Sequence, residues 1–392
     1  MNPAPKVNAA GKKLWILAGE TSGDCYGAEL AKALHELAPD LKLAGMGSAQ
    51  MRAAGVELLV DSTELGVVGL VEVFRHLLTF CRIYFDLARR AASERPAAVV
   101  LIDYPGFNLR FAARLRRLGI PVIYYVSPQV WAWGRGRLPR MARMIQRMLT
   151  IFPFEPPLYQ RVGLRADFVG HPLVDLLRPP ADAPAERDPH LVLLLPGSRG
   201  GELDRLLGPI LDTAEALHVH HPELRFVIPT PRASIRDMVE RHLAAHRGRL
   251  APTLHLEVSC GDTHAWMRRA VAGLAASGTV TVESAILGLP LVVVYRVNPL
   301  TFLLAKWLVR VPYITMVNLV ADEAVFEEFL QDDVRPAVLV PALERILPGG
   351  ARHDLALAGI AKAVGALRTP AGESASRNAA RLVLEELTAN AR

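Results

Sequence analysis

The amino-acid sequence predicts an α/β protein made of two Rossmann-like domains, each with a doubly wound parallel sheet. Three observations support this expectation. Short apolar runs alternate with amphipathic helical patterns along most of the chain. Polar loops that contain glycine follow several of these runs, as they do at the carboxyl ends of parallel strands. A stretch rich in proline, alanine and charge divides the chain into two similar halves.

The domain boundaries follow from that division. We expect an N-terminal domain at 1–178, a linker at 179–190 and a C-terminal domain at 191–350. The helical patterns within 351–392 are expected to pack back on the N-terminal domain or on a partner subunit.

The composition favours anionic partners. The 392 residues carry a formal net charge of +6, and basic blocks interleaved with aromatic residues do not occur, which argues against a nucleic-acid partner. Cys25, Cys81 and Cys260 form no CxxC pair, so neither a disulfide framework nor a zinc site is expected. No signal peptide or membrane-length apolar run is recognisable, and we expect a cytoplasmic location.

Strands are predicted where short apolar runs are bounded by turn residues. In the first half they are 14–18, 41–45, 97–103, 120–126 and 149–152. In the second half they are 191–195, 225–229, 253–258, 270–275 and 291–295. Helices are predicted at 26–37, 299–311, 337–346 and 375–387, among others. The polar loop at 19–24 follows the first strand, although no GxGxxG dinucleotide fingerprint occurs there.

Asp103 ends one predicted strand and precedes a helical pattern. Ligands of open parallel sheets bind beyond the carboxyl ends of the strands, so Asp103 lies where chemistry is expected. The alternative is a structural aspartate that caps the following helix, a role that Asn108 could also take.

Two segments of the first half stand out, one as a helix that is either buried or in contact with a membrane and the other as a basic stretch that suggests an anionic partner. The stretch 65–84 is apolar around more than one face of a helix, which is typical of a deeply buried helix or of one that contacts a membrane. The stretch 104–154 contains nine arginines and no acidic residue, and Arg140, Arg143 and Arg147 recur at helical spacing.

The segment 191–202 predicts a phosphate site. An apolar strand is broken by Pro196, Gly197 and Ser198, and a helical pattern follows. Backbone N–H groups at the start of such a helix can bind an anion, and Arg199 adds a planar cation suited to phosphate. The alternative is an ordinary strand-to-helix turn with a solvated arginine.

Several motifs resemble those of the lipid-A-disaccharide synthase family, which has the GT-B glycosyltransferase fold. The matching segments are AGETSGD (18–24), IDYPGFN (102–108), YVSPQVWAW (125–133), FPFE (152–155), GHP (170–172), LPGSR (195–199), SGT (277–279) with Glu283, and PLVVVY (290–295). Single motifs such as SGT are weak, but this order is specific and covers almost the whole chain.

The resemblance implies two Rossmann-like domains that face each other across a cleft, and a specific reaction. The chain would transfer 2,3-diacylglucosamine from its UDP derivative to the 6-hydroxyl of 2,3-diacylglucosamine 1-phosphate (lipid X). The products would be UDP and the β(1→6) disaccharide 1-phosphate, with inversion at the anomeric carbon, in the pathway that makes the lipid A of lipopolysaccharide in the Gram-negative outer membrane. Inversion in one displacement needs a base and stabilisation of the departing UDP.

The resemblance also assigns roles to residues. Asp103 is the expected base, with Asp24, Glu20 and His171 as less favoured candidates. The nucleotide and its diphosphate are expected at Gly197, Ser198, Arg199, Glu202, Ser277, Gly278, Thr279 and Glu283. The acceptor and the rest of the cleft are expected at Glu20, Ser22, Gly23, Asp24, Asn108, Ser127, Gln129, Trp131 and Asn318, although Trp131 and Trp133 could instead be core aromatics. No cofactor and no metal are expected.

A lipid substrate implies peripheral association with the cytoplasmic face of the inner membrane. The contact is expected at Val67, Val68, Leu70, Val71, Phe74, Leu77 and Leu78. The basic stretch 110–147 would then face anionic headgroups or the acceptor's phosphate. A homodimer with exchanged C-terminal segments is compatible with the sequence.

Departures from the family pattern and rival classes leave alternatives. Family members often carry an acid where this chain has Gly106; if that acid were the base, the assignment to Asp103 would be wrong. Another GT-B enzyme, such as a UDP-N-acetylglucosamine 2-epimerase or the transferase that makes peptidoglycan lipid II, would share the uridine end of the site. A non-catalytic protein that binds the membrane surface would be expected to lack Asp103, Arg199 or Glu283, and all three are present.

Overall fold

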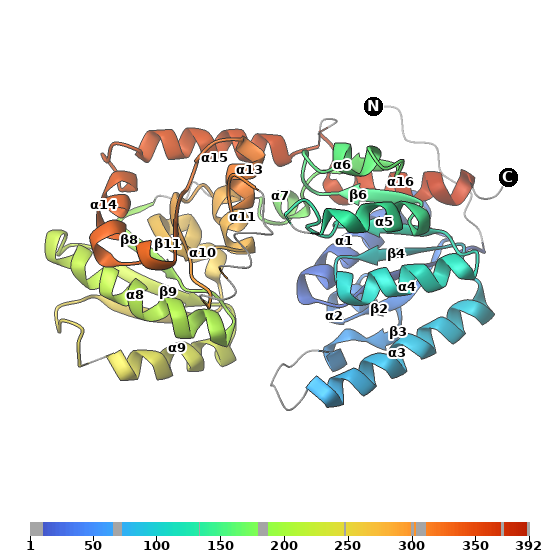
Figure 1. The fold of residues 1–392 in the computed structure, drawn as a ribbon, viewed down its shortest axis with the longest axis horizontal. Coiled ribbons are helices and arrows are strands. Elements are labelled where there is room, and N and C mark those ends of the chain that lie inside the picture. The colour runs from blue at the N-terminus through green and yellow to red at the C-terminus, as the bar shows by residue number, and fades with distance from the viewer. Residues whose placement is uncertain are drawn as a thin grey trace. The chain divides into compact units, whose positions relative to one another are not determined.

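The computed structural model describes residues 11–65, 73–132, 134–178, 187–246, 248–298, 302, 311–369 and 372–389. The chain divides into two compact units (Figure 1). The first unit comprises Met1–Pro172 and Arg368–Arg392, and the second comprises Leu173–Leu367. Each unit contains one parallel sheet with helices packed against it, so the predicted α/β class is confirmed.

The first unit has a seven-stranded sheet in the order β3-β2-β1-β4-β5-β6-β7. Every strand pairs parallel to its neighbours. The strands are β1 (Lys13–Ala18), β2 (Lys42–Gly47), β3 (Glu57–Asp61), β4 (Ala98–Ile102), β5 (Val122–Tyr125), β6 (Arg147–Thr150) and β7 (Ala166–Phe168). The strand order reverses between β1 and β4, which makes the carboxyl ends of these two strands the switch point of the sheet.

Helices cover this sheet because each has an apolar face. They are α1 (Thr21–Leu37), α2 (Ala49–Ala53), α3 (Val73–Glu94), α4 (Pro105–Arg117), α5 (Leu138–Met144), α6 (Pro156–Gln160) and α16 (Ala375–Ala389). Leu87 of α3 and Phe111 of α4 are buried against Trp15 and Val99 of the sheet. The C-terminal helix α16 packs along α1, so the end of the chain completes the first unit.

The second unit has a six-stranded sheet in the order β10-β9-β8-β11-β12-β13, again with parallel pairs. The strands are β8 (Asp188–Leu195), β9 (Arg225–Thr230), β10 (Leu256–Cys260), β11 (Ala270–Ala276), β12 (Leu291–Tyr295) and β13 (Glu327–Leu330). Here the order reverses between β8 and β11.

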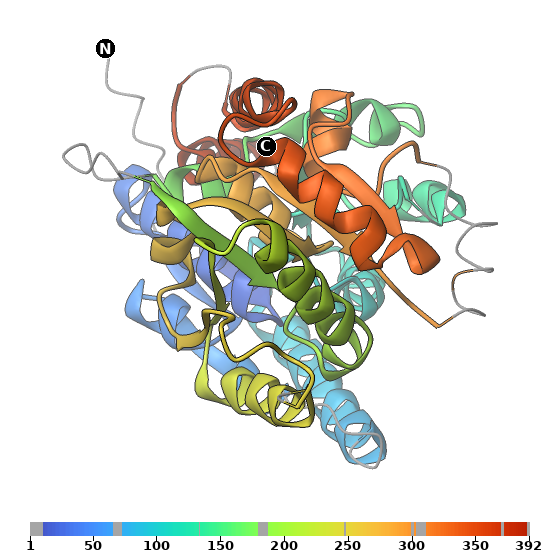
Figure 2. The same ribbon diagram turned by 90° about the vertical axis from the view of Figure 1, so that its left-hand side faces the viewer.

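The helices of the second unit lie on both faces of its sheet. They are α7 (Pro172–Leu176, which begins at the last residue of the first unit), α8 (Gly200–His220), α9 (Ala233–His246), α10 (Thr263–Arg269), α11 (Thr279–Ile286), α13 (Met316–Ala321), α14 (Pro336–Ile346) and α15 (His353–Leu367). Helices α8, α9 and α14 share one apolar core with the sheet and lie on the face turned to the viewer in Figure 2.

Several local expectations need correction. The predicted loop at 19–24 is shorter, because α1 begins at Thr21. Gly23 fits inside the helix because its missing side chain allows close packing: a Cβ there would lie 3.3 Å from Cβ of Ala18. The strands β3, β7 and β13 were not predicted.

Other predicted segments fall partly outside the described residues. The predicted linker overlaps β8 from Asp188, and its residues 179–186 are not described. Of the predicted helix 65–84, the described helical part begins at Val73, and of 299–311 only 302 and 311 are described.

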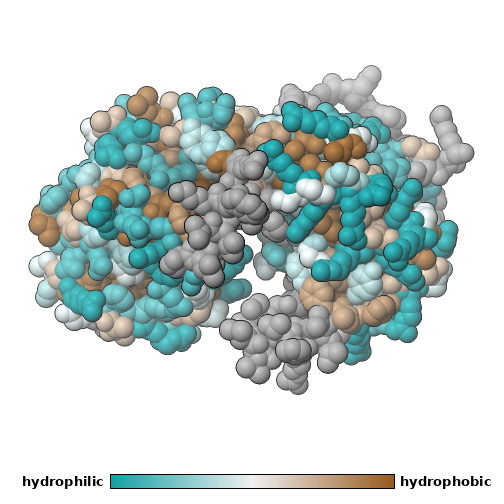
Figure 3. Space-filling view, in the orientation of Figure 1, coloured by the Kyte–Doolittle hydropathy of each residue, from teal (hydrophilic) through white to brown (hydrophobic). Residues whose placement is uncertain are grey.

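The described surface gives no sign of a spanning segment. The face shown in Figure 3 is largely hydrophilic over both units, with apolar side chains scattered among the charged ones. Among the described helices, none is both long and apolar enough to cross a membrane.

Arg147 does not belong to a helical row of arginines, which corrects the sequence prediction. It lies in β6 with a side chain that is only 2% exposed. Its guanidinium donates to Asp167 Oδ2 at 2.7 Å and to Glu385 Oε2 at 2.9 Å, and it lies 3.2 Å from Glu386 Oε1. The two glutamates belong to α16, so this buried ion cluster holds the end of the chain on the first sheet.

We expect Arg147→Met to loosen α16. Removing the cation takes away the buried guanidinium that joins Asp167, Glu385 and Glu386, although Glu386 keeps Arg165 and Gln146 at 2.9 Å. Breaking a buried ion pair costs about 3–5 kcal/mol. Amide hydrogen exchange in 375–389 should accelerate by roughly a hundredfold or more. The matched control is Arg377→Met, which removes an exposed pair between α16 and Glu36 of α1 and should cost less than about 1 kcal/mol. Equal exchange in both variants would contradict the role of the cluster.

Candidate active site

The carboxyl ends of β4 and β5 are held in an unusual backbone conformation. Asp103 and Tyr104 follow β4 with φ values of 45° and 47°, and Val126 follows β5 with a φ of 64°. Non-glycine residues rarely adopt this left-handed conformation, and for a β-branched valine it is a true outlier. Such conformations persist only where the surroundings enforce them, and they cluster at functional sites.

Buried side chains enforce the conformation of Asp103. The amide of Asn108 donates to the carbonyl oxygens of Ile102 and Asp103 at 3.0 and 2.8 Å. The hydroxyl of Tyr124 donates to the same Asp103 oxygen at 2.6 Å. Helix α4 begins with Tyr104 as its N-cap and has no side-chain cap, so neither Asp103 nor Asn108 caps the helix. Asn108 therefore positions Asp103.

The carboxyl group of Asp103 is poised near neutrality. Partial burial raises its pKa to about 6, and the negative charge of Glu20 contributes to the rise, although a hydrogen bond from the Tyr104 backbone opposes it. Glu20 is exposed and precedes α1, on the other side of the switch point. The Tyr104 ring lies against Gly19, where any Cβ would come within 2.2 Å of a ring carbon. The loops after β1 and β4 are thus brought together.

The other residues of the 19–24 segment have different roles. Ser22 is exposed on the first turn of α1, and Gly23 is buried beside β1. Asp24 is 1% exposed, and its carboxylate accepts from the backbone N–H groups of Ser48 and Gln50 at 2.6 and 3.1 Å. Asp24 thereby accepts hydrogen bonds from the free N–H groups at the start of α2. Its carboxylate braces the backbone there.

Sequence reasoning did not single out Glu155, which organises the loop after β5. Its carboxylate is almost fully buried and accepts from the hydroxyl of Ser127, from Trp131 Nε1 at 3.2 Å and from the Phe152 backbone at 3.1 Å. Burial raises its pKa to about 7, against the opposing effect of these hydrogen bonds. The signal was available, since Glu155 is the acid of the FPFE motif.

Two predicted residues of this loop are therefore buried and face inward. Ser127 and Trp131 are 6% and 7% exposed, and both bind Glu155. Gln129 between them is exposed and free to meet a ligand, while Trp133 lies outside the described residues. His171 is buried against Phe152, and burial lowers its pKa to about 3, which makes it a weak proton acceptor at neutral pH.

In the second unit, the predicted phosphate loop connects β8 with α8. Gly197 has a φ of +100°, and a Cβ there would lie 2.5 Å from Glu202 Oε2, so only glycine fits. Ser198 and Arg199 are exposed, and Arg199 is the N-cap of α8. Its guanidinium lies 3.4 Å from Glu202 Oε1, a loose contact that leaves most of the cation available.

The second loop of this unit follows β11. The backbone N–H of Ser277 donates to the carbonyl oxygen of Val294. Gly278 is the N-cap of α11, and the helix begins at Thr279. Glu283 is partly exposed, and His264 lies 3.5 Å from its carboxylate. Because β8 and β11 are neighbours, the two loops meet at the switch point of the sheet.

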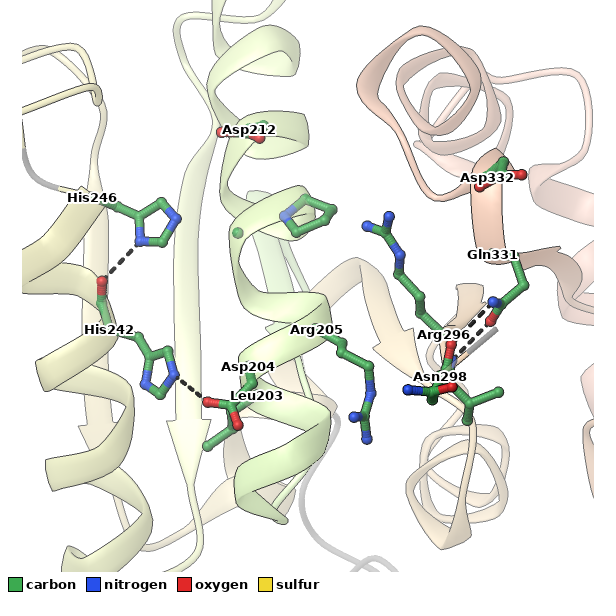
Figure 4. Close-up of a pocket in the computed structure, with 13 residues that line it drawn as sticks. Leu203, Asp204, Arg205, Asp212, His242, His246, Arg296, Asn298, Gln331 and Asp332 are labelled. Carbon is green, nitrogen blue, oxygen red and sulfur yellow. Dashed lines mark hydrogen bonds and ion pairs between the residues drawn. The ribbon is translucent and has the colours of Figure 1, made fainter. Parts of the chain in front are cut away.

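Two cavities lie in the second unit, and the smaller one opens beside this switch point. The smaller one has a volume of about 360 Å³ and is lined by Arg199, Glu202 and Ser277 from the predicted set, together with Arg205, Tyr295 and Arg296. The larger one, about 690 Å³, lies along α8, with His242 and His246 of α9 on one side and Arg296 and Gln331 on the other (Figure 4). Gly197, Ser198, Gly278, Thr279 and Glu283 line neither cavity.

Asn318 is fully buried in the second unit and braces a turn. Its amide donates to the Phe326 carbonyl and to Glu328 Oε1, both at 2.8 Å, and its oxygen accepts from the Phe326 N–H at 2.9 Å. These contacts use the whole side chain. The described part of the chain contains no cluster of three or more His, Cys, Asp or Glu side chains suited to a metal.

We expect Glu155→Ala to destabilise the first unit strongly. Three buried donors would lose their acceptor, and each such loss costs about 1–3 kcal/mol. Urea unfolding, followed by tryptophan fluorescence, should show a decrease of about 3 kcal/mol or more. Glu57→Ala is the control, since that glutamate is 67% exposed and pairs only loosely with Lys13, and it should cost less than about 1 kcal/mol. A similar small cost for both variants would refute the bracing role of Glu155.

Comparisons with known proteins identify the family. The family model described as lipid-A-disaccharide synthetase matches residues 14–360. A lipid-A-disaccharide synthase of Geobacter metallireducens is 40% identical over 361 residues, covering 90% of this chain and 92% of the relative. The enzyme of the same name from Geobacter sulfurreducens is 40% identical over 382 residues, covering 96% and 97%.

Solved structures share the fold at low identity. A glycotransferase of kitacinnamycin superposes with a TM-score of 0.62 at 17% identity, covering 96% of this chain and 99% of the other. The UDP-GlcNAc 2-epimerase from Neisseria meningitidis, bound to UDP-GlcNAc, gives a TM-score of 0.60 at 11% identity, covering 96% and 100%. Together with the family model and the sequence relatives, this likeness shows that the chain belongs to the lipid-A-disaccharide synthetase family of GT-B glycosyltransferases.

Proposed function

We propose that the enzyme transfers 2,3-diacylglucosamine from UDP-2,3-diacylglucosamine to the 6-hydroxyl of lipid X, with inversion. The observation that carries the proposal is Asp103: a partly buried carboxylate at a switch point, on a strained backbone fixed by Asn108 and Tyr124. Its pKa of about 6 leaves it ionised at neutral pH yet basic enough to accept a proton.

The second unit supplies the donor site in this proposal. The diphosphate of UDP lies against Arg199 and the first turn of α8, where the cation and the helix N-terminus both favour negative charge. The Ser277–Thr279 loop and Glu283 hold the uridine end through hydrogen bonds to the ribose. No cofactor enters the reaction as we propose it.

The reaction is a single displacement. Asp103 takes the proton from the acceptor's 6-hydroxyl as that oxygen forms its bond to the anomeric carbon of the donor. The bond from this carbon to the UDP oxygen breaks on the opposite face, and the electron pair leaves with UDP. Arg199 and the α8 N-terminus stabilise the charge that develops on the diphosphate.

Peripheral binding to the inner membrane remains part of the proposal. Val67, Val68, Leu70 and Val71 lie outside the described residues, as do the side chains of Phe74, Leu77 and Leu78. Farther along α3, Phe85 is 61% exposed between the exposed Arg82 and Arg89. Both arginines contact Asp86, and an exposed apolar ring beside basic side chains suits the interface of an anionic bilayer. Eight of the nine arginines in 104–154 are exposed, Arg147 being the exception. The homodimer remains a prediction.

The direct test is turnover in detergent micelles. The wild-type chain should form the disaccharide from UDP-2,3-diacylglucosamine and lipid X, and Asp103→Asn should lower kcat by about 10²–10⁴-fold while UDP affinity is kept. Arg199→Ala should instead weaken UDP binding. UDP release without disaccharide formation by the wild type would overturn the proposal and direct attention to hydrolysis or epimerisation. Full activity of Asp103→Asn would remove Asp103 from the role of base.

The pH dependence should report the ionisation of Asp103. The base works only when deprotonated, so kcat/KM should fall about tenfold per pH unit below a pH of about 6. Because the charge of Glu20 raises this pKa, Glu20→Gln should move the acidic limb to lower pH. Glu36→Gln, an exposed change near the far end of α1, is the control and should leave the limb in place. The acceptor's phosphate also titrates near pH 6, but its titration does not depend on Glu20. An acidic limb that Glu20→Gln leaves unmoved would contradict the assignment.

A further inference from the structure

Arg205 is a second arginine at the start of α8, and no motif pointed to it. It lies in the second turn, but its side chain extends back along the helix towards the N-terminal end (Figure 4). Gly201 allows this direction, since a Cβ on Gly201 would lie 3.0 Å from Nη2 of Arg205. The guanidinium therefore lies over the first turn of α8, close to the loop that carries Arg199.

This position is electrostatically unfavourable without an anion. The N-terminus of a helix carries partial positive charge, and a cation there is repelled. Neither nearby carboxylate pairs with Arg205: Glu202 lies 3.4 Å from Arg199, and Asp204 pairs with His242 at 2.9 Å. Among the residues that the structure describes, no carboxylate lies within 4.0 Å of the Arg205 guanidinium nitrogens.

Arg205 stands at the junction of the two cavities. It lines the smaller cavity with Arg199 and Ser277, and it also lines the larger cavity, which neither of those residues reaches. Arg296 and Val297 also line both cavities, so these two residues and Arg205 mark the junction. In the proposed donor site the ribose lies at Ser277, so a diphosphate that reaches towards the larger cavity would meet Arg205 with its second phosphate.

We propose that Arg205 binds the terminal phosphate of the nucleoside diphosphate and so makes the site prefer a diphosphate over a monophosphate. The inference rests on the proposed donor site. Three guanidinium groups line the smaller cavity, and those of Arg199 and Arg205 both belong to the start of α8, one for each phosphate. Gly201 leaves room for the Arg205 guanidinium.

The test compares UDP and UMP binding by titration calorimetry. Arg205→Met keeps most of the aliphatic side chain and removes the charge, and it should weaken UDP binding by about tenfold or more while UMP binding changes by less than about twofold. Arg241→Met removes the same charge from α9, outside both cavities, and should leave both affinities unchanged. Equal losses for UDP and UMP in Arg205→Met, or no loss for either, would overturn the inference.

A second variant tests the geometry without removing the charge. Gly201→Ala places a methyl group against the Arg205 guanidinium and should weaken UDP binding by a few-fold in the wild-type background. In the Arg205→Met background the same change should have no further effect, because the group that it displaces is gone. Additive losses would contradict the proposed contact. If the wild-type chain binds neither nucleotide, the donor site itself is wrong and the inference falls with it.

Discussion

Parallel strand pairing is the constraint on which both candidate sites depend. Since every described pair in each sheet is parallel, the carboxyl ends of all strands in a unit lie at one edge, and the loops that follow them converge there. The order of strands then selects the useful place along this edge. The strand order reverses between β1 and β4 in the first unit and between β8 and β11 in the second. The candidate site residues lie in the loops beside these two pairs of strands.

The two edges offer different chemical groups because their side chains differ. At the first, Asp103 and Glu20 place two carboxylates near each other, and their mutual repulsion together with burial raises the pKa of Asp103. At the second, Arg199, Arg205 and Arg296 line one cavity with a single carboxylate, Glu202. One edge is suited to accept a proton and the other to bind an anion, and these are the two requirements of an inverting transfer to a hydroxyl group.

The sequence predicts the central strands of each sheet better than the outer strands β3, β7 and β13. The central strands are continuous apolar runs and were recognised, whereas β3, β7 and β13 contain charged residues within three to five positions and have no clear period. The motifs also placed Asp103 directly after a strand and Arg199 in the loop before a helix, as the structure has them. What the pattern could not show is which polar side chains face inward. Asp24, Asn108 and Asn318 were expected at the ligand, but their hydrogen bonds brace the backbone. Glu155 and Arg147 acquire their roles from partners that lie far along the chain. The position of the Arg205 side chain depends on Gly201. A local sequence pattern shows neither of these relations.

The central claim is that this chain joins two acylated glucosamines by an inverting transfer, and the bond in the product tests it most directly. Nuclear magnetic resonance of the product formed by the wild-type enzyme from UDP-2,3-diacylglucosamine and lipid X gives both the linkage and the anomeric configuration. The account predicts one β(1→6) linkage for each UDP released. An α linkage would contradict the single displacement, and UDP release without any new glycosidic bond would contradict the transfer itself.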